Sequence, residues 1–157
     1  MPNTPVSQEI GWYLSGYTDG EGSFCVSFSP RSKMRIKLEV RPSFSVGQNI
    51  ARPEVLEIFK DTFGCGSIRP NRNDRTLKYE IRCLQELIGK IIPFFEEFSL
   101  KSSKNQDFRL FSQVCRLMAD GEQLSGSGLK RIIGLAYQMN PSGKRKYSKE
   151  YLLEILR

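Results

Sequence analysis

Every second residue is apolar over residues 24–28 and again over residues 36–46, with mostly serine and charged residues between them. This period of two is typical of β-strands that bury one face. A second, shorter pair of strands is predicted at residues 66–71 and 77–83, with alternation of apolar and charged residues over 77–82, and a basic turn joins the members of each pair. The pattern therefore predicts two β-hairpins.

Helical patterns precede, separate and follow these hairpins. Ser7 is a suitable N-cap for a helix that runs to about Thr18. Pro53 begins a second helix and Gly64 ends it. Further helices are predicted at residues 85–98 with a kink or break at Pro93, and at residues 105–118, 129–139 and 148–156.

The order of these elements indicates the fold class. Helix, hairpin, helix, hairpin and helix follow one another, which predicts an α+β fold with an antiparallel sheet. We expect a single domain over residues 1–157, with its core at about 7–120 and C-terminal helices at about 127–157.

The chain carries 24 Lys and Arg against 17 Asp and Glu, a net charge of +7. Paired strands with a basic polar face can lie in the major groove of DNA, where phosphate contacts supply most of the affinity. A merely solvated sheet face would give a similar pattern, but the clustering of basic residues on the strands and in both turns favours nucleic acid. The predicted DNA contacts are Ser27, Ser29, Arg31, Lys33, Arg35, Lys37, Glu39, Arg41, Ser43, Ser45, Arg69, Arg72, Arg75, Lys78 and Arg82.

Composition excludes several other classes of function. The chain has no histidine, which excludes Ser-His-Asp and Cys-His hydrolases and His-ligated zinc. The cysteines are spread without a CxxC motif, so neither a zinc cluster nor a disulfide framework is indicated. No apolar run could span a bilayer and the first residues lack a signal-peptide pattern. We therefore expect a non-secreted, intracellular protein of the cytoplasm or an organelle, with no membrane partner.

The segment Leu14–Gly22, LSGYTDGEG, places two acids among glycines at the end of the first predicted helix. A carboxylate in a glycine-flanked turn can bind a hard divalent cation, with a backbone carbonyl and waters completing the shell. An ordinary polar helix end would also give this pattern. Gly16 and Gly20 lie four residues apart, so a second backbone could approach the helix there.

Leu14–Gly22, followed by Ser23 and Phe24, resembles the signature of the LAGLIDADG homing endonucleases. The order of elements is similar to the αββαββα core of that family over most of residues 7–120. The resemblance implies a saddle-like antiparallel sheet for DNA. It also implies an intron-encoded enzyme that cleaves both DNA strands at a long pseudo-palindromic site by metal-dependent phosphodiester hydrolysis.

The resemblance also assigns the metal site. It implies that Glu21 binds the catalytic metal together with the backbone carbonyl of Gly20, and that Asp19 has a structural role. Glu21 stands where the family pattern has aspartate, so the carboxylate is kept on a longer side chain. The implied cofactor is Mg²⁺ or another divalent cation such as Mn²⁺, whereas Ca²⁺ would bind without supporting cleavage.

Further catalytic residues are implied in the same way. Gln48 closes the long second strand, where the family often has a polar residue near the catalytic water, and Arg52 follows it. Either Lys101 or Lys104 is similar to the family's basic residue near the scissile phosphate. All of these side chains could equally be ordinary surface residues.

A single signature predicts a homodimer, because one chain then supplies one carboxylate and cleavage of two strands needs two. The signature helices would cross with both Glu21 carboxylates near the centre. The interface residues implied by the resemblance are Leu14, Gly16, Tyr17 and Gly20.

Two alternatives on the same fold stay open. One is an RNA maturase, which would bind intron RNA and would not need the Glu21 carboxylate. The other is a DNA-binding protein that has lost cleavage. The presence of Glu21 and of two candidate lysines favours the endonuclease.

Overall fold

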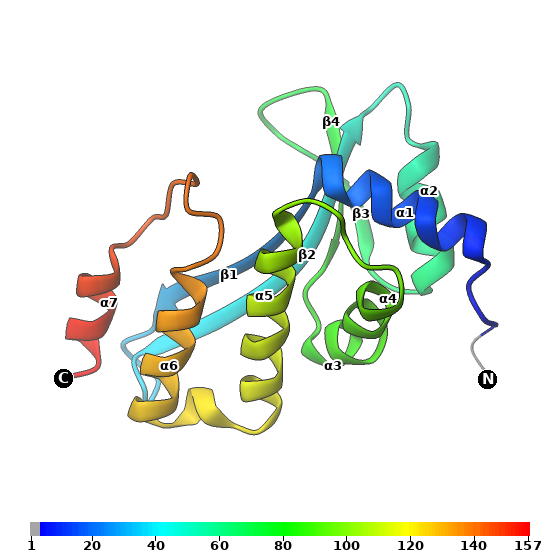
Figure 1. The fold of residues 1–157 in the computed structure, drawn as a ribbon. Helices are drawn as coiled ribbons and strands as arrows, with labels where there is room; N and C mark the ends of the chain where they lie inside the picture. Colours follow the sequence, from blue (N-terminus) through cyan, green and yellow to red (C-terminus); the bar gives the residue numbers. More distant parts are fainter. Residues whose placement is uncertain (1–3) are drawn as a thin grey trace. The chain divides into compact units, whose positions relative to one another are not determined.

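The computed structural model describes residues 4–157. Its four strands form one sheet in the order β1–β2–β4–β3, in which β4 pairs antiparallel with both of its neighbours (Figure 1). The predicted α+β fold with two hairpins is confirmed. The strands are β1 (Gly22–Pro30), β2 (Leu38–Asn49), β3 (Ser67–Pro70) and β4 (Thr76–Ile81).

Contacts divide the chain into two compact units. The first consists of the chain up to Ser23 together with Phe44–Asn105, and the second of Phe24–Ser43 together with Gln106–Arg157. The C-terminal helices share a unit with residues 24–43. No helix within residues 4–157 is long and apolar enough to cross a membrane.

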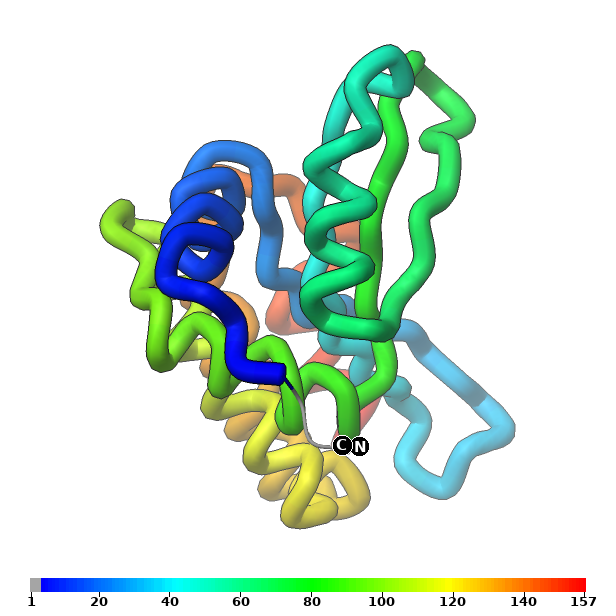
Figure 2. Tube along the Cα trace, turned by 90° about the vertical axis from the view of Figure 1, so that its right-hand side faces the viewer, coloured from blue at the N-terminus to red at the C-terminus, as the bar shows by residue number. Residues whose placement is uncertain are grey.

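The first unit is built on a core of aromatic rings. Phe44 on β2 lies 6.2 Å from Phe59 and 5.5 Å from Phe95, between ring centroids. Tyr79 on β4 stacks on Phe59 at 5.9 Å. These contacts hold α2 along the β3–β4 hairpin (Figure 2). The helices of this unit are α1 (Gln8–Glu21), α2 (Glu54–Phe63), α3 (Leu84–Glu86), a π-helical turn (Leu87–Ile91) and α4 (Ile92–Glu97).

The second unit buries the apolar side of β1. Phe24 lies 5.4 Å from Phe108 and 5.3 Å from Phe111, between ring centroids, so the predicted alternation on this strand is confirmed. Nη1 of Arg145 donates to the carbonyl of Val26 at 2.8 Å, which ties the link before α7 to the same strand. Helices α5 and α6 run side by side in opposite directions (Figure 1). The helices are α5 (Lys104–Ala119), a 3₁₀ turn (Glu122–Leu124), α6 (Gly126–Ala136) and α7 (Lys149–Ile155).

The predicted boundaries of two helices in the first unit differ from the structure, and in the second unit α6 spans Gly126–Ala136 where a helix over residues 129–139 was predicted. At the kink or break expected near Pro93, the structure has a π-helical turn that ends at Ile91, and Pro93 then lies in the first turn of α4, where its missing N–H costs little. Helix α1 continues to Glu21, three residues past the predicted end at Thr18. The acids of the signature segment therefore occupy the last helical turn.

Helix α1 has a tight glycine that the sequence pattern did not indicate. A Cβ placed on Gly11 would lie 2.3 Å from the ring of Phe98, which is itself buried. We predict that Gly11→Ala lowers the free energy of unfolding by about 1–3 kcal/mol, because the ring has no room to move. Chemical denaturation measures this. Gly134→Ala is the matched control, because a Cβ there meets nothing within 4 Å and the change is expected to be neutral or stabilising.

Candidate active site and nucleic-acid interface

The carboxylate of Asp19 ties the end of α1 to the segment that precedes α5. Its oxygens accept hydrogen bonds from the backbone N–H of Lys101 at 2.8 Å and from Oγ of Ser102 at 2.6 Å. Burial alone would raise the pKa of Asp19, but the hydrogen bonds from Ser102 and Lys101 and the charge of Lys104 outweigh it and lower the pKa. These contacts agree with the structural role expected for Asp19.

The lowered pKa of Asp19 predicts a pH dependence of stability. Because the folded state favours the ionised carboxylate, this stabilisation is present above the ordinary aspartate pKa of about 4 and is lost as the pH falls through the lowered value. Asp19→Asn should cost about 1 kcal/mol at pH 7. The difference from the parent should shrink between pH 5 and pH 3, as measured by thermal unfolding. A difference that stays constant over this range would contradict the role.

Lys104 lies at the same helix end. Its Nζ donates to the carbonyls of Thr18 at 2.9 Å and Gly22 at 2.6 Å, so a positive charge sits where the α1 dipole is negative. Lys101 points elsewhere, because its Nζ lies 4.8 Å from the ring centroid of Trp12. Both lysines contact the carboxyl end of α1, Lys101 through its backbone N–H, but only Lys104 brings its ammonium group there.

Glu21 and Gly20 are exposed on the last turn of α1. Within residues 4–157, no hydrogen bond or ion pair engages the Glu21 carboxylate. The described residues also contain no cluster of three metal-ligating side chains. Among the described residues, the end of α1 therefore offers the Glu21 carboxylate and neighbouring backbone carbonyls, which suits a Mg²⁺-type ion that takes its other ligands from water and phosphate oxygens.

Gln48 lies beside the signature helix. The Tyr17 hydroxyl donates to the carbonyl of Gly47 at 3.1 Å. Burial raises the pKa of Tyr17 most, the charges of Glu21 and Tyr13 raise it further, and a hydrogen bond with Gln48 lowers it. Tyr17, Glu21 and Gln48 are thus neighbours. No contact described for residues 4–157 brings the side chain of exposed Arg52 to this group.

The predicted helix–helix interface needs one correction. Leu14 is fully buried in its own chain and cannot lie at a surface for a partner. The reason is helical geometry, because residues two apart face opposite sides of a helix. Gly16 and Gly20 are exposed, and a Cβ on either would meet nothing within 4 Å. Tyr17 is half-buried and packs on a ring of α2.

Two interface candidates were missed by sequence reasoning. Trp12 and Tyr13 are 42% and 48% exposed, which is high for large aromatic side chains. Both lie on the side of α1 that carries Gly16 and Gly20, because positions 12, 13, 16 and 20 fall within about 100° of one another at 100° per residue. That spacing was readable in the sequence.

The predicted DNA contacts fall into two groups, one in each unit. In the first unit Arg69, Arg72, Arg75, Lys78 and Arg82 are all exposed. The prediction that Ser45 contacts DNA needs correction, because this residue is only 9% exposed. It lies opposite Glu80 on the neighbouring strand β4.

In the second unit the exposed predicted contacts are Ser27, Arg31, Lys33, Arg35, Lys37 and Arg41, while Ser29, Glu39 and Ser43 are partly covered. Arg35 is held within its own unit, because its Nη2 donates to the carbonyl of Leu124 at 2.8 Å. Arg31 and Arg41 both contact the carboxylate of Glu39. In the first unit, the carboxylate of Glu80 contacts Lys78 and Arg82 in the same way. Sequence reasoning missed Glu80, although its place between the basic residues Lys78 and Arg82 was visible in the sequence.

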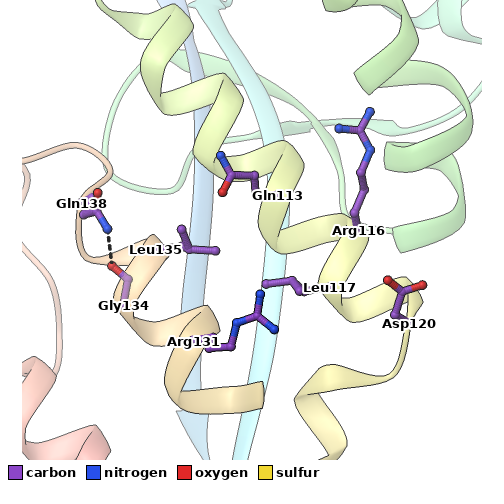
Figure 3. Close-up of a pocket in the computed structure, with 8 residues that line it drawn as sticks. All are labelled: Gln113, Arg116, Leu117, Asp120, Arg131, Gly134, Leu135 and Gln138. Carbon is purple, nitrogen blue, oxygen red and sulfur yellow. Dashed lines mark hydrogen bonds between the residues drawn. The ribbon is translucent and has the colours of Figure 1, made fainter. Parts of the chain in front are cut away.

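A separate pocket of about 490 Å³ lies between α5 and α6 (Figure 3). Arg116, Asp120, Arg131 and Gln138 are among its lining residues. None of the predicted catalytic or DNA-contacting residues lines it, so it is not part of the candidate site.

The model of the LAGLIDADG endonuclease family matches residues 14–115. The chain therefore belongs to the LAGLIDADG endonuclease family, and the resemblance of its signature segment is confirmed. It is 32% identical over 134 residues, 85% of the chain, to "Probable intron-encoded DNA endonuclease 1" of Mycosarcoma maydis. The chain spans 47% of that relative's length.

Solved structures of the family have the same fold. The homing endonuclease I-TnaI is 32% identical, with a TM-score of 0.86 over 98% of this chain and 100% of that chain. I-SmaMI, bound to uncleaved DNA in the presence of calcium ions, is 34% identical, with a TM-score of 0.82 over 90% of this chain and 47% of that chain.

Proposed function

We propose that this protein is a site-specific endonuclease that hydrolyses both strands of DNA at a long pseudo-palindromic site. The end of α1 carries the proposal, because an exposed carboxylate without a partner among residues 4–157 and the ammonium group of Lys104 share that helix end. Hydrolysis of a phosphodiester needs an activated water and stabilisation of the developing negative charge. A carboxylate that can hold a metal and a nearby ammonium group suit these two needs. The DNA substrate would place the activity in the cytoplasm or an organelle.

Glu21 and the carbonyl of Gly20 would hold a divalent cation, Mg²⁺ or Mn²⁺. A bound cation would lower the pKa of a water and offset charge on the phosphate. Gln48, beside the signature helix, would orient that water, Arg52 would approach the phosphate backbone, and Lys104 would stabilise the charge on the scissile phosphate. The chain has no histidine, so the proton of the attacking water would pass to solvent.

The assembly we propose is a homodimer. Residues 1–157 contain one signature, and the exposed side of α1 has room for a second backbone at Gly16 and Gly20. A twofold arrangement would bring two Glu21 carboxylates to the two scissile phosphates and would read a site with twofold character. Light scattering on this 157-residue chain should give twice its 18.0 kDa mass.

A library of plasmids with randomised inserts tests the function. We expect a subset of plasmids to be linearised with Mg²⁺ or Mn²⁺, and to be bound but left uncut with Ca²⁺. Binding should weaken steeply with salt, because phosphate contacts dominate affinity. Binding of structured RNA in preference to this DNA would favour the maturase alternative, and selection of a site without cleavage would favour the non-cleaving one.

The two candidate lysines make a matched pair for mutation. We predict that Lys104→Met lowers the cleavage rate by about 10²–10³-fold, because it removes a positive charge next to the reacting phosphate. Lys101→Met should change the rate by less than about threefold, because this ammonium group lies over Trp12. Single-turnover cleavage of the selected site measures both rates. An equal loss in the two variants would contradict the assignment.

A further inference from the structure

Two carboxylates on the strands each hold two basic side chains. In the first unit, Oε1 of Glu80 lies 2.8 Å from Nε of Arg82, and Oε2 lies 3.0 Å from Nζ of Lys78. In the second unit, Oε2 of Glu39 lies 2.9 Å from Nε of Arg31 and 3.0 Å from Nη2 of Arg41.

Neither simple stability nor attraction to DNA accounts for these glutamates. Exposed ion pairs contribute little to folding free energy, because solvent screens them. A negative charge next to a phosphate backbone also opposes binding. Glu80 is covered more than the groups it holds, since its side chain is 17% exposed against 69% for Arg82. Its carboxylate is therefore less accessible to DNA than the two basic side chains that it holds.

The atoms used in these contacts determine what each arginine can still do. Arg82 and Arg31 are both held through Nε. No contact described for residues 4–157 engages their Nη1 and Nη2 groups, and this pair of donors can bind O6 and N7 of guanine in the major groove. Arg41 contacts Glu39 through one of its Nη nitrogens, so its pair of terminal donors is not free. Lys78 carries a single ammonium group and cannot offer two parallel donors.

Small neighbours leave space around the first of these arginine–glutamate pairs. Glu80 is flanked across the strands by Ser45 on one side and Ser67 on the other. A hollow of about 210 Å³ beside it is lined by Arg82 and Arg69. The hydrogen bonds from Arg31 and then Arg41 lower the pKa of Glu39, so the second carboxylate stays ionised at neutral pH.

We propose that Glu80 and Glu39 are positioning residues that hold the guanidinium groups of Arg82 and Arg31 ready to recognise guanine. Each arginine would enter the major groove already ordered, with less side-chain entropy to lose on binding. The target half-site would then contain a guanine opposite each of them. This inference rests on the proposed DNA-binding function and goes further, because it names the base.

Selection of bound sites from a randomised DNA library, with Ca²⁺ present and sequencing of the bound fraction, tests the pairs. The parent should select guanine at one position of each half-site that Arg82→Lys no longer selects. Glu80→Gln should reduce the guanine preference at that same position by about tenfold. Glu39→Gln and Arg31→Lys should act together at a different position. Glu86→Gln is the control, because Glu86 lines the same hollow and no described ion pair engages it.

Three outcomes would overturn the inference. The first is an unchanged guanine preference in Glu80→Gln while the parent selects a defined site, which leaves the proposed function standing. The second is a loss of preference spread over all positions together with a lower unfolding temperature, which indicates a purely structural role. The third is a parent that selects no sequence at all, which overturns the proposed function as well.

Discussion

Glu21→Gln is expected to abolish cleavage of both DNA strands while leaving DNA binding and the fold intact. The substitution keeps the size of the side chain and removes one negative charge. That charge has no partner among residues 4–157, so its loss breaks no ion pair in the chain. A cation site with a single protein carboxylate would lose most of its affinity, and the stabilisation supplied by a metal amounts to several kcal/mol. We therefore expect the rate to fall by at least about 10³-fold.

The control for this variant lies on the same helix. Glu9→Gln removes the same charge from an exposed position in the first turn of α1, and it should cut at the rate of the parent. A mixture of parent and Glu21→Gln chains gives a sharper test, because mixed dimers should nick one strand. If Glu21→Gln linearises the selected plasmid as fast as the parent, the assignment of the metal site is wrong.

Local patterns predicted the elements of this fold but not the end of the helix that carries the site. Alternation of apolar residues indicated β1, β2 and β4, whereas the short strand β3 shows no alternation of buried and exposed residues. Helix α1 continues through Asp19 to Glu21 because Lys104 and Ser102 bind its last turn from 82 or more residues away in sequence. A local sequence pattern does not reveal contacts between residues so far apart in the chain. The sequence therefore predicted that Asp19 and Glu21 lie in a turn after the helix.

The same limit explains which site residues could be assigned. The family signature indicated Glu21 and Gly20, and the structure leaves both exposed. Distinguishing Lys104 from Lys101 required tertiary structure, because the two differ in which distant group they contact. Leu14 was assigned wrongly for a different reason, since its helical phase opposite Gly16 was available in the sequence and was not applied.

Gly16→Leu should convert the proposed homodimer into a monomer and thereby remove double-strand cleavage. Within one chain a side chain at this position meets nothing within 4 Å, so the monomer should fold normally. In a twofold dimer the added side chain enters the helix contact twice. Each intrusion into a packed contact costs about 1–3 kcal/mol, so the dimer dissociation constant should rise by at least about 30-fold.

The matched control for Gly16→Leu is Gly134→Leu, because Gly134 also lies in a helix and has open space around its Cα. This variant should remain a dimer and cut normally. Sedimentation velocity and cleavage of the selected plasmid measure the two effects. Both substitutions add the same apolar group to a helix, and only Gly16 lies where α1 of a second chain would pack. A difference between the two variants therefore reports the loss of that helix contact. A Gly16→Leu chain that stays dimeric and active would mean that the chains associate through another surface.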